Sequence, residues 1–89
     1  VKSNIGHLEA AAGMAGLLKA VSCLTHCVVP PNLLHGVRLN PLLEESMEKG
    51  TAMIFPTSEC VEVIKTHAGV SSFGFGGTNA CLVFDRFTE

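Results

Sequence analysis

The chain has 89 residues, of which 47% are hydrophobic and only 16% charged, with a formal net charge of −2. This charge and the absence of Trp and Tyr argue against nucleic-acid binding, which needs a basic surface and commonly aromatic rings for base stacking. A domain this short buries only about 60% of the surface that its unfolded chain exposes. So much apolar sequence predicts neighbouring layers or a partner subunit, and we expect a segment of a longer protein.

The first predicted element is a long helix over residues 8–28. It is rich in Ala, Leu and Met and ends before Pro30 and Pro31, which cannot continue a helix. Its apolar residues go most of the way around, so we expect it to be largely buried between layers. Its longest apolar or small stretch, residues 10–18, is well short of the roughly 20 residues that cross a bilayer. No membrane span is predicted.

Shorter elements follow. Residues 42–49 predict a short helix closed by Gly50. Four runs favour β-strands: residues 53–55, 60–64, 68–73 and 80–84. The last two bracket a glycine-rich turn, so we expect them to pair as neighbouring strands. No repeat or linker divides the chain, and residues 1–89 are expected to form one fragment with no internal boundary.

The motif KSNIGH at residues 2–7 lies immediately before the long helix. We expect Lys2 and His7 on a strand end and loop, where rigid elements commonly present catalytic groups. A lysine and a histidine there could together stabilise developing negative charge. Taken alone, the spacing favours the simpler alternative of a solvated lysine and a histidine in the first turn of a helix.

A second motif, SSFGFGGTNA, occupies residues 71–80. Its glycines permit backbone angles closed to other residues and leave amide N–H groups exposed, which suits an anion or an oxyanion. It is neither a dinucleotide-binding fingerprint, because the spaced third glycine is missing, nor a P-loop, because no Gly-Lys-Ser/Thr follows. An ordinary hairpin turn is the alternative.

The cysteines and acidic residues do not have the spacing of a metal site. Cys23, His26 and Cys27 lie within about one helical turn and His35 follows, but the matched second pair of structural zinc modules is missing. No metal is predicted. Reduced thiols are expected at Cys23, Cys27, Cys60 and Cys81. A solvated helix face is expected for Glu44, Glu45 and Glu48.

Two longer blocks extend these motifs: VKSNIGHLEAAAGMAGLLKA at residues 1–20 and AGVSSFGFGGTNA at residues 68–80. Together they resemble the last two signature blocks of the β-ketoacyl synthase (condensing enzyme) family, and PPNLL at residues 30–34 is similar to the family's connecting loop. Order and spacing match over essentially the whole chain. The resemblance implies an α/β chain, part of the C-terminal half of a thiolase-like fold layered α-β-α-β-α.

The resemblance also implies a reaction. In this family a cysteine takes an acyl group as a thioester, a malonyl-type extender on an acyl carrier protein is decarboxylated, and the carbanion attacks the thioester. The partners implied are the acyl carrier protein, which carries phosphopantetheine, the rest of the ketosynthase domain and a second subunit in a homodimer. No directly bound cofactor is implied, and the family suggests a cytoplasmic location without excluding an organelle.

Site residues follow from the same resemblance. His7 matches the second of the family's two histidines, which hydrogen-bonds the extender's thioester carbonyl and stabilises the enolate. Lys2 matches the lysine that supports this histidine and the local charge balance. Phe75 matches the residue whose backbone N–H shares the oxyanion hole with that of the nucleophilic cysteine, while its ring gates the acyl pocket. The glycines that would let this loop change shape are Gly74, Gly76 and Gly77.

Several departures limit the resemblance. The family's nucleophile block and first-histidine block are missing, so we expect the isolated chain to be inactive. Cys81 replaces the usual histidine after Thr-Asn-Ala, a change that concerns local packing. Gly16 stands where many single-domain fatty-acid synthases have an acidic residue, and Glu9 resembles the multidomain polyketide pattern. These two favour a type I polyketide synthase.

Three alternatives remain open at this point. The ketosynthase could belong to a multidomain fatty-acid synthase. It could also be a non-catalytic, chain-length-factor-like partner, although intact Lys2, His7 and Phe75 argue against decay. An independent small binding module is disfavoured, because a helix that is apolar nearly all round would have nothing to pack against on one side.

Overall fold

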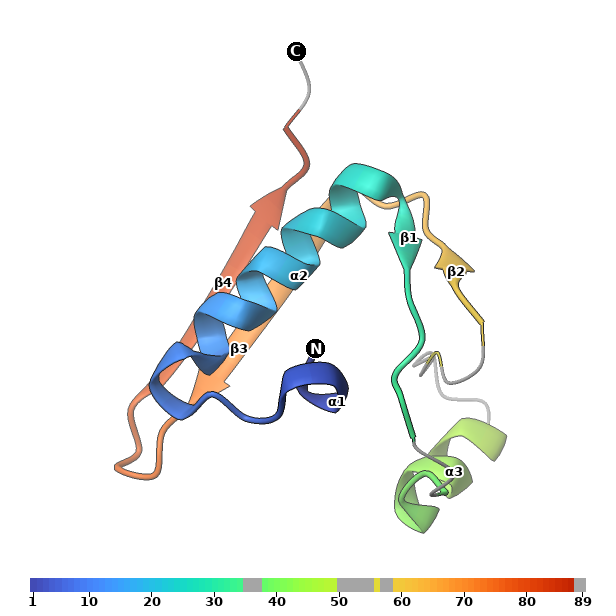
Figure 1. Ribbon diagram of the computed structural model, residues 1–89, viewed down its shortest axis with the longest axis horizontal. Coiled ribbons are helices and arrows are strands. Elements are labelled where there is room, and N and C mark those ends of the chain that lie inside the picture. Colours follow the sequence, from blue (N-terminus) through green and yellow to red (C-terminus); the bar gives the residue numbers. More distant parts are fainter. Residues whose placement is uncertain (35–37, 50–55, 57–58, 88–89) are drawn as a thin grey trace.

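A helix of 15 residues that lies along a two-stranded β-hairpin forms the centre of the structure (Figure 1). The computed structural model describes residues 1–34, 38–49, 56 and 59–87. In chain order the elements are α1 (Lys2–Ile5), the 3₁₀ turn η1 (Glu9–Ala11), α2 (Ala12–His26), β1 (Val28–Val29), α3 (Pro41–Glu48), β2 (Val61–Glu62), β3 (His67–Phe73) and β4 (Asn79–Asp85). The described chain therefore mixes helices and strands, as the sequence predicts.

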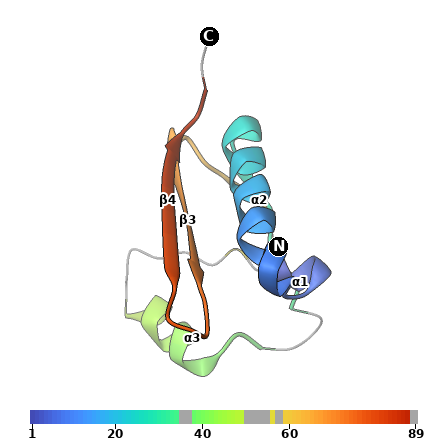
Figure 2. The same cartoon turned by 90° about the vertical axis from the view of Figure 1, so that its left-hand side faces the viewer.

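The hairpin of β3 and β4 confirms the two strands predicted around the glycine-rich turn. The strands pair antiparallel, with Ser71 opposite Cys81 near the middle of the register. Side chains alternate along β3, where Ala68, Val70 and Ser72 are half-buried and the residues between them are exposed. This period of two turns one face of β3 toward α2, and Figure 2 shows the helix and the hairpin side by side.

The long helix is shorter than predicted at both ends. Residues 9–11 form the 3₁₀ turn η1, and Glu9 has a left-handed φ of 50° that an α-helix does not accept. At the other end Cys27 is also left-handed, with φ 55° and ψ 34°, and its N–H donates to the carbonyl of Cys23. A left-handed residue at this place stops a helix, so α2 ends before the prolines are reached.

The segment before η1 corrects one prediction. Lys2 does not lie on a strand end, because residues 2–5 form the single helical turn α1. Hydrogen bonds within the turn account for this: the carbonyl of Val1 accepts the N–H groups of Asn4 and Ile5, and that of Lys2 accepts the N–H of Gly6 at 2.8 Å. His7 lies in the loop that follows, as expected.

Two glycines bring α2 close to β3. A Cβ atom on Gly13 would lie 3.4 Å from the Ser72 Oγ atom, and a Cβ atom on Gly16 would lie 3.4 Å from the Val70 Cγ1 atom. Both distances are at the near limit of van der Waals contact. The helix backbone therefore approaches the strand at a distance that a residue larger than alanine at either position would not permit.

The prediction that α2 is largely buried is wrong for this chain. Among the described residues only Leu24 is buried, at 8% exposure. Met14, Leu18 and Val21 remain 59%, 64% and 44% exposed, because the hairpin covers one face of the helix and leaves the other open. No described helix is long and apolar enough to cross a membrane.

A second, smaller sheet adjoins the C-terminal end of α2, and α3 lies beyond that sheet (Figure 1). β1 pairs antiparallel with β2, which falls within the β-prone run predicted at residues 60–64. The side chain of Asn40 accepts the N–H of Leu42 at 2.9 Å and so caps α3, one residue earlier than predicted. Gly50 and the run at residues 53–55 lie outside the described residues.

The predicted acidic face of α3 is solvated and partly paired. Glu44 accepts a hydrogen bond from the Arg38 guanidinium at 2.8 Å, and Glu45 accepts one from Lys49 at 2.6 Å. Exposed pairs of this kind contribute only about 0–1 kcal/mol each. They are surface contacts and not paired catalytic carboxylates.

The contact at Gly16 predicts a size limit. Gly16→Leu should lower the stability of the protein by about 1–3 kcal/mol, because the side chain would have to push α2 away from Val70. Gly16→Ala is the matched control, since one methyl group can sit at van der Waals distance and alanine favours a helix. Thermal unfolding of the full-length protein measures both. Equal melting temperatures for the two variants would contradict the close contact.

Candidate active site

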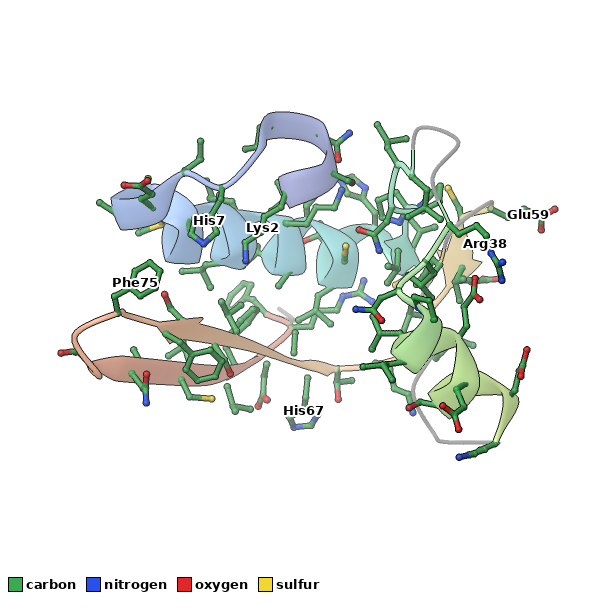
Figure 3. All side chains as sticks on the ribbon, turned by 90° about the horizontal axis from the view of Figure 1, so that it is seen from below. Lys2, His7, Arg38, Glu59, His67 and Phe75 are labelled. Carbon is green, nitrogen blue, oxygen red and sulfur yellow. The ribbon has the colours of Figure 1, made fainter. Side chains whose placement is uncertain are left out.

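Two cavities that share lining residues bring the predicted site residues together. The first, of about 490 Å³, is lined by Lys2 and His7 and by Ser72 and Phe73 from β3. The second, of about 670 Å³, is lined by His7, Phe73 and Phe75. Because His7 and Phe73 line both, Lys2, His7 and Phe75 surround one region between the N-terminal segment and the hairpin (Figure 3).

The ring of His7 has a defined proton arrangement. Its Nδ1 atom accepts the backbone N–H of Glu9 at 2.9 Å. A nitrogen that accepts an N–H carries no proton of its own, so the neutral ring holds its proton on Nε2. The exposed His7 therefore presents an N–H donor to whatever occupies the two cavities.

The backbone of Leu8 makes this arrangement possible. With φ −82° and ψ 9° at Leu8, the chain turns and directs the Glu9 N–H back toward the His7 ring two residues earlier. Glu9 itself has a left-handed φ of 50°, which is uncommon for a residue with a side chain and leads the chain into η1. The turn at Leu8 and Glu9 thus selects the tautomer of a candidate catalytic histidine.

Lys2 lies on the exposed first turn of the chain, and its side chain shares the first cavity with His7. Figure 3 shows both side chains directed toward the hairpin. The ammonium group thus adds a positive charge to the region in which the His7 donor lies, which favours negative charge there.

Phe75 lies at the tip of the hairpin, with its ring fully exposed. The turn is closed by two hydrogen bonds, from the N–H of Gly74 to the carbonyl of Thr78 at 2.8 Å and from the N–H of Gly77 to the carbonyl of Gly74 at 3.0 Å. The expectation that the glycine amides are left exposed is therefore wrong for Gly74 and Gly77. These two amides hold the turn.

The three loop glycines differ in what the structure requires of them. A Cβ atom on Gly74 would lie 3.1 Å from the Thr78 carbonyl oxygen, and Gly77 has a φ of 90°, so both positions favour glycine. Gly76 has open space around it and no positive φ. Gly74 lines the second cavity, whereas Gly76 and Gly77 line neither.

The four cysteines are free thiols, and none of them lines either cavity. Cys81 faces its strand partner Ser71, whose hydroxyl donates to the Cys81 Sγ atom at 3.5 Å. Cys27 accepts a hydrogen bond from the Arg86 guanidinium at 2.9 Å. Within the described residues, no three His, Cys, Asp or Glu side chains gather as a metal site would require.

Sequence reasoning missed several contacts. Phe73 and Ser72 line both cavities, and Asn32, from the segment after β1, lines the first. Nothing in a single sequence indicates the Glu9 N–H as the partner of His7, because the signal is a backbone angle. The alternation of β3 could have suggested Ser72, since it follows Val70 on the face turned toward α2.

A further hydrogen-bonded chain lies outside the site. The Thr66 hydroxyl and His67 Nδ1 are 2.7 Å apart, and His67 Nε2 lies 2.9 Å from a carboxylate oxygen of Asp85. The His67 and Asp85 side chains are 68% and 71% exposed. Figure 3 shows His67 directed away from α2. This group joins the two strands at the open end of the hairpin.

The first part of the chain matches a known family. Residues 1–35, which contain Lys2, His7 and all of α2, match the family model described as the C-terminal domain of β-ketoacyl synthases. This match identifies a segment of the C-terminal part of a β-ketoacyl synthase domain in the chain. Such a domain implies a thiolase-like α/β fold, and the mixed helix and strand structure is consistent with it. No solved structure matches the chain.

This chain is similar to polyketide synthases over nearly its whole length. It is 39% identical to a highly reducing polyketide synthase of Aspergillus terreus, over 98% of this chain and 4% of that protein. It is 46% identical to a hybrid PKS-NRPS synthetase of Dothistroma septosporum, over 100% of this chain and 2% of that protein. It is 41% identical to a phenolphthiocerol/phthiocerol polyketide synthase subunit of Mycobacterium tuberculosis, over 100% of this chain and 6% of that subunit. The chain thus spans only a few per cent of these relatives.

The His7–Glu9 contact predicts a conformational requirement at position 9. Glu9→Gly should keep the Nε2–H tautomer, because glycine adopts positive φ readily and retains the N–H. Glu9→Val should shift the ring toward a mixture of tautomers. A β-branched residue opposes the positive φ at position 9 and so disturbs the turn that holds the N–H of residue 9 against the ring. Nitrogen NMR shifts of labelled imidazole rings, assigned by loss of the signal in His7→Ala, measure the tautomer. Identical ring shifts in the two Glu9 variants would refute the requirement.

Proposed function

We propose that this chain supplies the decarboxylation half of a polyketide ketosynthase site. The observation that carries the proposal is the His7 ring, whose Nδ1 is occupied by the Glu9 N–H and whose Nε2–H is therefore a donor beside the two cavities. The match of residues 1–35 to the ketosynthase family and the similarity to polyketide synthases support it. They favour polyketide over fatty-acid synthesis.

In the proposed reaction a malonyl-type thioester enters on the phosphopantetheine arm of an acyl carrier protein. The bond between the α-carbon and the carboxylate breaks, carbon dioxide leaves, and the electron pair forms an enolate. The Nε2–H of His7 donates to the enolate oxygen, and the Lys2 ammonium favours the same negative charge. Fixed donors aimed at developing charge commonly supply the largest catalytic contribution.

The second step forms the new carbon–carbon bond. The enolate carbon attacks the carbonyl of an acyl thioester held on a cysteine of the ketosynthase domain, and the thiolate leaves. The backbone N–H of Phe75, with that of the nucleophilic cysteine, would bind the oxygen of the tetrahedral intermediate. The Phe75 ring would gate the acyl pocket, with Gly74, Gly76 and Gly77 as the flexible positions of the loop.

The nucleophilic cysteine has to come from outside this chain, because all four of its cysteines are among the described residues. None of the four free cysteines lines the cavities that contain His7. We therefore propose that the isolated chain is inactive, and that residues 1–89 work as one part of a larger acyltransferase domain. The open apolar face of α2, with Met14 and Leu18 more than half exposed, supports its placement inside the layered α-β-α-β-α core of a homodimeric, cytoplasmic enzyme.

His7 provides the direct test. In the full-length protein, His7→Ala should lower the rate of carbon dioxide release from a malonyl carrier protein by about 100- to 1,000-fold, because the enolate loses its donor. The control is His26→Ala, which removes an exposed histidine at the last turn of α2. Thermal unfolding of both variants checks that His7→Ala is as stable as His26→Ala. Decarboxylation that is indifferent to His7 would overturn the proposed role.

Phe75 provides a second test, of specificity. Phe75→Ala should leave decarboxylation nearly unchanged but alter the ratio of kcat/KM between long and short acyl primers by about tenfold, because the ring bounds the acyl pocket. Phe87→Ala is the matched control, since its ring is 84% exposed near the end of the described chain. The measurement is condensation with a series of acyl primers. An unchanged selectivity ratio would show that the Phe75 ring does not bound the acyl pocket.

A further inference from the structure

The helical turn α1 carries Lys2 but is weakly fixed. It has four residues and its backbone hydrogen bonds are internal, and so short a helix is not stable alone. Among the described residues, no Cα atom of another helix or strand lies within 8 Å of a Cα atom of α1. Gly6 follows with a φ of 74°, a residue about which the backbone can pivot. Something else must hold the turn over the cavity.

A hydrogen bond from the segment after β1 meets this need. The backbone N–H of Leu33 donates to the hydroxyl oxygen of Ser3 at 3.1 Å, across 30 residues of sequence. Ser3 is half-buried and follows Lys2 directly on α1. The bond therefore ties the turn that carries the ammonium group to a distant part of the chain.

The segment that makes this bond is itself anchored. The N–H of Asn32 donates to the carbonyl of Pro56 at 2.8 Å, and the preceding strand β1 pairs with β2. β1 also packs against α2. The Leu33 N–H is thus held by structure that does not depend on α1, so it can act as a fixed point for the turn.

Ser3 and the anchoring segment belong to the wall of the same cavity as the site. The cavity of about 490 Å³ is lined by Lys2, Ser3 and His7 on one side and also by Asn32. We propose that Ser3 is a positioning residue that fixes Lys2 over this cavity through the Ser3–Leu33 hydrogen bond, an inference that rests on the proposed function. His7 is fixed separately, by the Glu9 N–H beyond Gly6.

Because Ser3 acts through Lys2 and not through His7, its removal has a distinct signature. Ser3→Ala in the full-length protein lowers kcat for malonyl decarboxylation by about five- to tenfold, the size expected for one neutral hydrogen bond, and leaves KM within about twofold. Hydrogen exchange speeds up in the peptide that contains Leu33. The tautomer of His7 does not change. Ser3→Thr keeps the hydroxyl and restores both the rate and the protection.

A double-mutant cycle distinguishes positioning from a general loss of structure. In a Lys2→Ala background, Ser3→Ala lowers kcat by a further factor of less than about two, because the effects of residues that act as one unit are not additive. The control is Ser22→Ala, which alters an exposed serine on α2 and changes neither kcat nor hydrogen exchange at Leu33. A full additional loss in the Lys2→Ala background, unchanged exchange at Leu33, or failure of Ser3→Thr to restore activity would each overturn the positioning role.

The two proposals fail in different ways. A full-length protein that shows no malonyl decarboxylation would overturn the proposed function, and the role of Ser3 with it, even if exchange at Leu33 depends on Ser3. An active protein in which Ser3→Ala has the rate of the unaltered protein would overturn the positioning role alone.

Discussion

The close approach of α2 to β3 determines where the site can form. Gly13 and Gly16 let the helix backbone lie against Ser72 and Val70, and the helix consequently runs along the hairpin with its first turn beside the hairpin tip (Figure 1). His7 precedes that first turn and Phe75 occupies the tip. His7 and Phe75, far apart in the sequence, therefore line one cavity, and the missing side chains of two glycines near the start of α2 permit this.

Local backbone geometry then decides what His7 can do. The turn at Leu8 brings the N–H of Glu9 to the ring of His7 and leaves the proton on the other ring nitrogen. The left-handed conformation of Glu9 that follows costs about 1–3 kcal/mol for a residue with a side chain. The chain thus sets the chemistry of the ring with a main-chain N–H and not with the Glu9 carboxylate.

The sequence predicted those features that depend on residue type and order. The hairpin at residues 67–85 follows from two apolar runs around GFGG, and the helix from a run of Ala, Leu and Met. The two family motifs placed Lys2, His7 and Phe75 in one site, and the structure brings them around shared cavities. Positive φ angles at non-glycine residues cannot be predicted from these patterns. For this reason both ends of the long helix, which lie after Glu9 and before Cys27, were misplaced. Lys2 was also assigned to a strand end, whereas residues 2–5 form a helical turn held by its own hydrogen bonds.

The two ends of the hairpin are held very differently. At the open end the N–H of Arg86 donates to the carbonyl of Thr66, the Arg86 guanidinium donates to Cys27 at the C-terminal end of α2, and His67 and Asp85 join the strands. At the tip the described contacts that close the turn are its own hydrogen bonds. The packing of α2 along β3 reaches Ser72, so the hairpin is supported up to the start of the turn. Phe75 lies beyond that support, and the turn can therefore move the aromatic ring beside His7 without separating the strands from α2.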